Sequence, residues 1–247
     1  MMPMDLNCDM GESFGTNIVG QDENIMPFVT SSNIACGFHG GDPVHIEKTI
    51  QLAIKHNIRI GAHPSYPDLE GFGRRPMKLP KEELKSILRY QIAALKGMVE
   101  SAGGKLSYVK PHGALYNTAA HSRDETLTII EAIQSIDPKL ALMGFAGSVM
   151  QKEAKAKGMA FIAEAFADRR YEPDGSLMSR SKEGAVLTNV EDVVDQVRNL
   201  VEKQRVKTSD GTYISVKADS ICVHGDNPSA PEIVKVIREF LIAQNGS

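Results

Sequence analysis

The stretch KEELKSILRYQIAALKGMVESAGGKLSYVKPHG, residues 81–113, decides the fold class because a helix, a stop and a buried strand follow one another in it. Apolar residues in its first part recur along one face of a helix over Lys81–Ser101: Leu84, Ile87, Leu88, Ile92, Leu95, Met98 and Val99. A Gly-Gly pair then stops the helix. The apolar run Leu106–Val109 predicts a short buried strand, and the polar side chains of Lys110 and His112 follow its end.

The same alternation of short apolar runs and helical patterns extends along the whole chain. Seven apolar runs predict buried parallel strands: Met4–Cys8, Asn33–Cys36, Ile58–Ala62, Leu106–Val109, Leu140–Phe145, Ala160–Ala165 and Ser220–Val223. Helix starts are indicated by capping residues: Asp42 before Pro43, Ser122 with Glu125, Thr188 with Glu191, and Ser229 with Glu232. Strands that alternate with helices imply right-handed crossovers between parallel strands. We predict one α/β domain over residues 1–247, a distorted (β/α) barrel of about seven parallel strands, with a doubly wound open sheet as the alternative.

Two irregular stretches and one hairpin interrupt this pattern. The irregular stretches are Tyr66–Leu79, after the third strand, and Asp168–Leu187, after the sixth. Arg205–Val216 predicts a surface hairpin with Asp210 and Gly211 at its turn.

Composition excludes several classes of protein. The chain has 247 residues, 42% hydrophobic and 24% charged, with a net charge of -3, which is ordinary for a globular protein. A near-neutral charge provides no footprint for nucleic acid or for an anionic membrane. No apolar run approaches the roughly 18 residues that span a bilayer, and the polar, acidic start is unlike a signal peptide. Three widely spaced cysteines predict free thiols and a cytoplasmic protein.

Ionisable and amide side chains gather where the predicted strands end. In chain order they are Asn7, Asp9, Glu12, His39, Asp42, His63, Lys110, His112, Glu164, Asp168, Arg169, His224, Asp226 and Asn227. The carboxyl ends of parallel strands meet at one face, where α/β proteins bind ligands, so we expect the site there. Arg74 and Arg75, in the loop after the third strand, can clamp a carboxylate or phosphate. The other histidines, His45, His56 and His121, are predicted to lie at the surface.

Two alternative chemistries remain open at this face. Asp9, His39 and His63 offer one carboxylate and two imidazoles, a set that suits Zn²⁺ or another divalent metal, although no HExxH pair supports it. The cysteines at strand ends could supply a nucleophile, but buried small apolar residues explain them equally well. The chain has neither a GxxxxGK[ST] phosphate loop nor a GxGxxG turn.

Six motifs at the strand ends carry a resemblance to a known family. They are DLNCDMGESFG (5–15), SSNIACGFHGGDP (31–43), IGAHPSYPDLEGFGRR (60–75), VKPHGALYN (109–117), EAFADRRYEPDGSLMSR (164–180) and ICVHGDNP (221–228). In these stretches, which span nearly the whole chain, the sequence resembles the LamB/YcsF family. The resemblance implies a seven-stranded barrel akin to polysaccharide deacetylases and some glycoside hydrolases. It implies ATP-dependent opening of 5-oxo-L-proline to L-glutamate by a complex with two other subunits, which would bind ATP partly or wholly.

Placement at one face, together with membership of these motifs, suggests a role for each residue. We expect catalytic roles for Asp9, His39, His63, Lys110, His112 and Asp226. We expect substrate binding by Asn7, Glu12, Arg74, Arg75, Glu164, Arg169 and His224. Asp9 or His63 would act as general base for water, and Lys110 would stabilise negative charge on oxygen. A metal-dependent hydrolase of an amide or carbohydrate, and a non-catalytic binding subunit, are the alternatives. A bound metal and assembly with further copies of the chain are left open.

Overall fold

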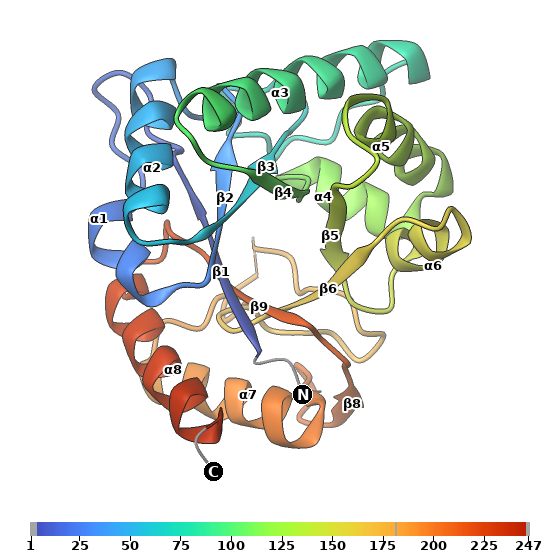
Figure 1. The fold of residues 1–247 in the computed structure, drawn as a ribbon. Helices are drawn as coiled ribbons and strands as arrows, with labels where there is room; N and C mark the ends of the chain where they lie inside the picture. The colour runs from blue at the N-terminus through green and yellow to red at the C-terminus, as the bar shows by residue number, and fades with distance from the viewer. Residues whose placement is uncertain (1–3, 181, 246–247) are drawn as a thin grey trace.

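The central feature of the computed structural model, which describes residues 4–180 and 182–245, is a closed barrel of parallel strands (Figure 1). In order around the barrel the strands are β1 (Asp5–Met10), β2 (Ser31–Ala35), β3 (Arg59–His63), β4 (Leu106–Val109), β5 (Ala141–Phe145), β6 (Phe161–Phe166) and β9 (Ser220–Val223). β9 pairs with both β6 and β1 and thereby closes the sheet. The seven-stranded barrel is confirmed, and the open-sheet alternative is wrong because an open sheet would leave two edge strands unpaired.

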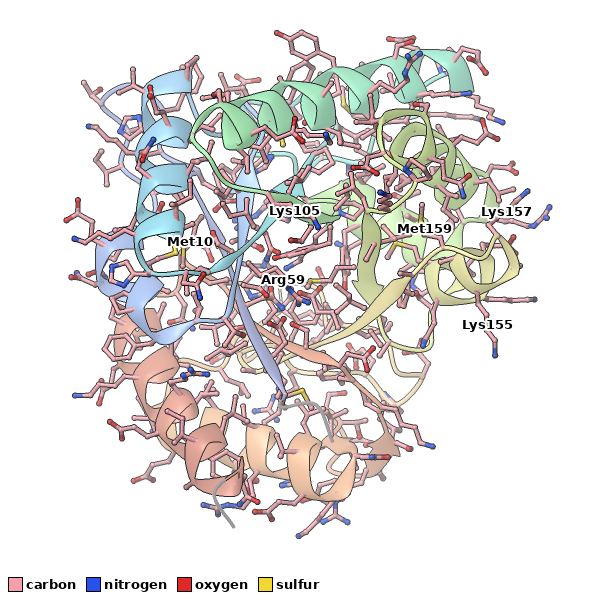
Figure 2. All side chains as sticks on the ribbon, viewed as in Figure 1. Met10, Arg59, Lys105, Lys155, Lys157 and Met159 are labelled. Atoms are coloured by element: carbon pink, nitrogen blue, oxygen red, sulfur yellow. The ribbon has the colours of Figure 1, made fainter. Side chains whose placement is uncertain are left out.

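Helices connect consecutive strands and surround the barrel (Figure 1). They are α1 (Asp22–Ile25), the 3₁₀ turn η1 (Met26–Phe28), α2 (Pro43–Lys55), α3 (Lys81–Ser101), α4 (Gly113–His121), α5 (Arg123–Ile136), α6 (Val149–Ala156), α7 (Val190–Lys203) and α8 (Ala230–Asn245). The exposed Lys155 and Lys157, at the end of α6, point away from the barrel (Figure 2). β7 (Arg205–Lys207) and β8 (Tyr213–Ser215) form the predicted hairpin. Within the described ranges, none of the helices has the length and apolar character needed to cross a membrane.

Capping side chains set where the helices begin. The Asp42 carboxylate accepts two backbone N–H groups in the first turn of α2, and Ser122 Oγ accepts the N–H of Glu125 in α5, both as predicted. The prediction for α7 is wrong by one residue. Asn189 rather than Thr188 caps it, because the Asn189 side chain accepts the first free N–H groups of that helix.

The apolar core lies between the barrel and its helices, whereas the interior of the barrel is polar. At the amino ends of the strands, Arg59 pairs with Asp5 at 3.1 Å and donates to Ser31. One layer higher, Asn33 donates to Asn7 at 2.7 Å and accepts from the Tyr108 hydroxyl at 2.6 Å. A third layer contains Asp9, Lys110 and Glu164, and it forms the floor of the cavity described below. We call these the three interior layers.

Gly61 of β3 makes room for the middle layer. A Cβ atom at this position would overlap the ring of Tyr108. We predict that Gly61→Ala lowers the free energy of unfolding by about 1–3 kcal/mol, because the ring must move and weaken its hydrogen bond to Asn33. Urea unfolding measures the change. Gly97→Ala in α3 is the control, since a methyl group there meets no atom within 4 Å and should raise stability by about 0.5–1 kcal/mol. Equal stabilities of the Gly61 variant and the wild type would contradict this packing.

Candidate active site

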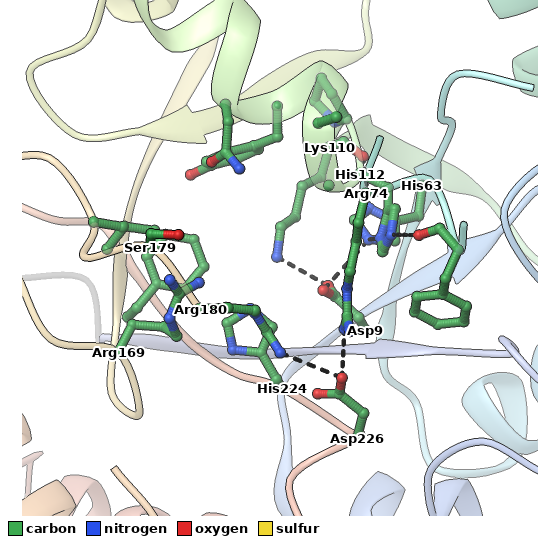
Figure 3. A pocket seen from close by; sticks show the side chains of 18 of the residues that line it. Asp9, His63, Arg74, Lys110, His112, Arg169, Ser179, Arg180, His224 and Asp226 are labelled. Carbon is green, nitrogen blue, oxygen red and sulfur yellow. Dashed lines mark hydrogen bonds and ion pairs between the residues drawn. The ribbon is translucent and has the colours of Figure 1, made fainter. Parts of the chain in front are cut away.

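A cavity of about 440 Å³ opens at the carboxyl ends of the strands (Figure 3). Nine of the predicted site residues line it: Asp9, Glu12, His63, Arg74, Lys110, His112, Arg169, His224 and Asp226. The two irregular stretches contribute to its wall through Phe72 and through the loop Ser176–Arg180. The predicted location of the site is therefore where the structure has its cavity.

Lys110 lies at the floor, almost completely buried between carboxylates. Its Nζ is 2.9 Å from Asp9 Oδ1, 2.7 Å from Glu164 Oε1 and 3.3 Å from the sulfur of Cys222. Burial alone would lower the pKa of Lys110, but these neighbours outweigh it and hold the pKa well above its ordinary value. Burial would likewise raise the pKa of Asp9, yet His63 and Lys110 hold it well below the usual range. Lysine and aspartate therefore face the cavity as a charged pair.

Three histidines and a glutamate pack beside this pair. The ring of His39 stacks on that of His112, with centroids 3.7 Å apart, and His39 Nε2 contacts Glu12 Oε1 at 3.0 Å. His63 Nε2 lies 2.9 Å from His112 Nδ1. Burial, together with the neighbouring imidazoles, lowers the pKa of both His39 and His112 well below the ordinary value. Burial and the nearby charge of Asp9 raise the pKa of Glu12 to about 8.

His224 is held by a buried carboxylate that the sequence analysis left without a role. Asp168 accepts from His224 Nδ1 at 2.8 Å and from its backbone N–H at 3.1 Å, and Phe166 stacks on the ring. Although burial would raise the pKa of Asp168, its interactions with His224 hold the pKa below the usual value. This pairing leaves Nε2 on the side of the ring away from Asp168, and His224 lines the cavity. The geometry suits proton transfer by His224.

Arginines form the rim of the cavity. Arg74 and Arg180 both contact Asp226 Oδ2, at 2.5 and 3.4 Å. Arg169 is 7% exposed and donates to the backbone carbonyls of Met178 and Ala185. Among the described residues, no carboxylate lies within ion-pair distance of Arg169. Burial and the charge of Arg180 lower the pKa of Arg169 to about 10, so it still carries a positive charge at neutral pH and can receive an anion.

Four predicted site residues lie outside the cavity wall. Asn7 and Glu164 belong to the interior layers beneath it, and His39 lies behind His112. Arg75 is in contact with Asp68 and Glu70 on the outer side of its loop.

Other residues proved to be misplaced by the sequence analysis or absent from it. Tyr116, Asn117, Ser179 and Arg180 line the cavity but were not singled out. A long loop after a strand is a signal of function, and it could have drawn attention to the segment Ser176–Arg180. His45 and His56 are half-buried, and the exposed His121 lies at the cavity rim. All three cysteines are buried and free, and burial raises the pKa of Cys36 to about 12 and that of Cys222 well above the usual value. A raised pKa disfavours a thiolate nucleophile.

A closed parallel barrel with an ionisable, largely buried site at its carboxyl edge defines a (β/α)-barrel enzyme. The model of the LamB/YcsF family matches residues 4–247, and the chain belongs to that family.

Similar proteins cover both chains almost completely. A protein of Pseudomonas syringae pv. tomato, named as an A-type subunit of 5-oxoprolinase, is 48% identical over 241 residues, 98% of this chain and 94% of its own. The A-type 5-oxoprolinase subunit of Pyrococcus furiosus is 46% identical, covering 97% of this chain and 94% of its own. The crystal structure of a lactam utilization protein from Thermus thermophilus superimposes with a TM-score of 0.92 at 41% identity, covering 99% of this chain and 98% of that one. A putative cellobiose-phosphate cleavage protein from Enterococcus faecalis, with a TM-score of 0.55 at 12% identity over 98% of this chain and 94% of that one, shares the fold alone.

Proposed function

We propose that this chain is one subunit of an ATP-dependent 5-oxoprolinase that opens 5-oxo-L-proline to L-glutamate. The observation that carries the proposal is the 46–48% identity, over nearly the full length of both chains, to relatives named as A-type subunits of 5-oxoprolinase. The word "subunit" in those names supports assembly with other chains, and we propose two partners. The three free cysteines fit a cytoplasmic location.

The cavity offers a partner for each polar group of such a substrate. A five-membered lactam with one carboxylate fits within about 440 Å³. Arg169, which has no carboxylate partner among the described residues, is the best placed to receive the substrate carboxylate. Lys110 can stabilise negative charge that develops on the lactam oxygen, and His224 can move a proton to or from water or the ring nitrogen.

The role of ATP follows from the chemistry of the lactam. A five-membered lactam is a poorly electrophilic amide with a poor leaving group. Transfer of a phosphoryl group to the lactam oxygen makes the ring carbon a good electrophile, water adds to it, and the ring C–N bond breaks. Since the sequence contains no phosphate-binding loop, we propose that the partner subunits bind ATP partly or wholly.

Glutamate release from 5-oxo-L-proline tests this function. We expect release only with ATP and only when the chain is mixed with its two partner subunits. Arg169→Gln should raise KM for 5-oxo-L-proline at least about tenfold, because it removes a charge-assisted contact with the carboxylate. Arg170→Gln, a neighbour outside the cavity wall, is the matched control and should leave KM within about twofold. Absence of glutamate from every mixture would overturn the proposal.

A further inference from the structure

The hydrogen bonds of His63 and His112 leave two lone pairs facing each other. His63 Nδ1 lies 2.7 Å from the backbone oxygen of Lys110, and His112 Nε2 lies 2.9 Å from that of Phe72. A carbonyl oxygen only accepts, so both of these ring nitrogens carry the proton. In neutral rings, His63 Nε2 and His112 Nδ1 are then both acceptors, and yet they lie 2.9 Å apart. A cation has to lie between or beside them.

A carboxylate completes the set on the same side. Glu12 Oε1 lies 3.5 Å from His112 Nδ1, and one donor atom from each of Glu12, His39, His63 and His112 lies within 4.8 Å of the others. Two ligands of a tetrahedral zinc ion, each bound at about 2.0–2.1 Å, are about 3.3 Å apart. The separations of 2.9 and 3.5 Å lie on either side of this value, so small movements would accommodate the ion.

His39 belongs to the surroundings of the site rather than to the ligands. Its ring is within 2° of parallel to that of His112, so the two in-plane lone pairs cannot both point at one ion. Its Nε2 instead contacts Glu12 Oε1 at 3.0 Å and holds that carboxylate in place. Metal-binding histidines typically donate their second ring N–H to a carbonyl or carboxylate, as His63 and His112 do here.

The charge around the cluster favours a divalent ion. Glu12, Asp9 and Glu164 are buried carboxylates in or next to this group, whereas Lys110 is the ammonium that pairs with two of them. Three negative charges against one positive charge leave room for two positive charges. Glu12, His63 and His112 also line the cavity, so a fourth ligand position can open to a water molecule or substrate.

We propose that Glu12 Oε1, His63 Nε2 and His112 Nδ1 bind a divalent transition metal, with zinc as the first choice and with His39 as a positioning residue. Two imidazoles and one carboxylate, with one position left open, form a donor set of catalytic zinc sites. The sequence analysis had grouped Asp9 with His39 and His63, whereas the converging donors in the structure are those of Glu12 and His112 with His63. The inference rests on this geometry and holds whichever reaction the cavity performs.

Metal binding can be measured without substrate. The chain, prepared without a polyhistidine tag and stripped of metal by a chelator, is titrated with Zn²⁺ and with Co²⁺. We expect about one equivalent of zinc by elemental analysis and visible d–d absorption with Co²⁺ that saturates at the same stoichiometry. His63→Gln and His112→Gln should each abolish the absorption, and His39→Ala should weaken affinity about 10–100-fold. Circular dichroism checks that each variant is folded.

His56→Ala is the matched control, because His56 ends α2 and takes no part in the cluster. It should bind metal like the wild type. A folded wild-type chain that binds neither zinc nor Co²⁺ stoichiometrically would overturn the proposal and leave a shared proton as the cation between His63 and His112. Stoichiometric binding that survives both glutamine variants would overturn it as well. Failure of the glutamate assay alongside intact metal binding would count against the proposed function only.

Discussion

Lys110→Met should abolish glutamate formation and destabilise the fold by about 3–5 kcal/mol. Methionine fills similar space but leaves Asp9 and Glu164 as buried carboxylates without their counter-charge, and the loss of one partner of a buried pair costs about this much. It also removes the ammonium from the cavity floor, and the loss of one such electrostatic contact typically lowers kcat about 10²–10³-fold.

Urea unfolding and glutamate assays at a temperature where the variant is folded separate the two effects. Lys105→Met is the matched control, because Lys105 is exposed one residue before the same strand and should change stability by less than about 0.5 kcal/mol. The double variant Lys110→Met/Glu164→Gln should regain part of the lost stability, since one unpaired charge is then removed. A single Lys110 variant as stable as the wild type would refute the paired-charge description of the floor.

Asp168→Asn should lower kcat about 10²–10⁴-fold and change KM little. The carboxylate fixes which nitrogen of His224 carries the proton, whereas an amide can present its N–H₂ group and favour the wrong tautomer. Asp174→Asn, an exposed change in the same loop, is the control and should leave kcat within about twofold. An Asp168 variant with wild-type kcat would show that His224 needs no orienting partner.

The same variant has a pH signature that a simple packing role would not produce. The pKa of Asp168 lies below its unfolded value, so the unfolded state binds the proton more tightly and the stabilisation exists above the unfolded pKa of about 3.9. The stability difference between wild type and Asp168→Asn should therefore be present at neutral pH. It should shrink as the pH falls below about 4, which unfolding at a series of pH values measures.

Local sequence signals predicted the elements, and long-range contacts decided the rest. The apolar run Leu106–Val109 is a strand in the structure because its pattern suffices to define it. Closure of the barrel depends on pairing between β9 and β1, which lie at opposite ends of the chain, and no local pattern encodes that pairing.

The site shows the same division between local and long-range information. Arg74 and Arg75 are adjacent and alike, so sequence alone cannot separate them. In the structure the backbone has positive φ at Phe72 (54°) and Gly73 (64°), and Arg74 then contacts Asp226 while Arg75 turns to Asp68. A similar limit applies to Glu12, because its carboxylate meets the histidines only after the glycine-rich turn after β2 folds over it.

The three interior layers bear on how this barrel can change over evolution or in engineering. An oily interior tolerates exchanges among residues of similar volume, because contact between apolar atoms has little directional preference. Here each inward-facing group from Asp5 to Lys110 has a specific donor or acceptor across the barrel, so a single exchange leaves its partner unsatisfied. Variation should therefore accumulate on the outward faces of the strands, where Leu6 and Ile221 pack in the apolar core. Inward positions would have to change in coordinated sets, and the catalytic floor inherits its rigidity from that constraint.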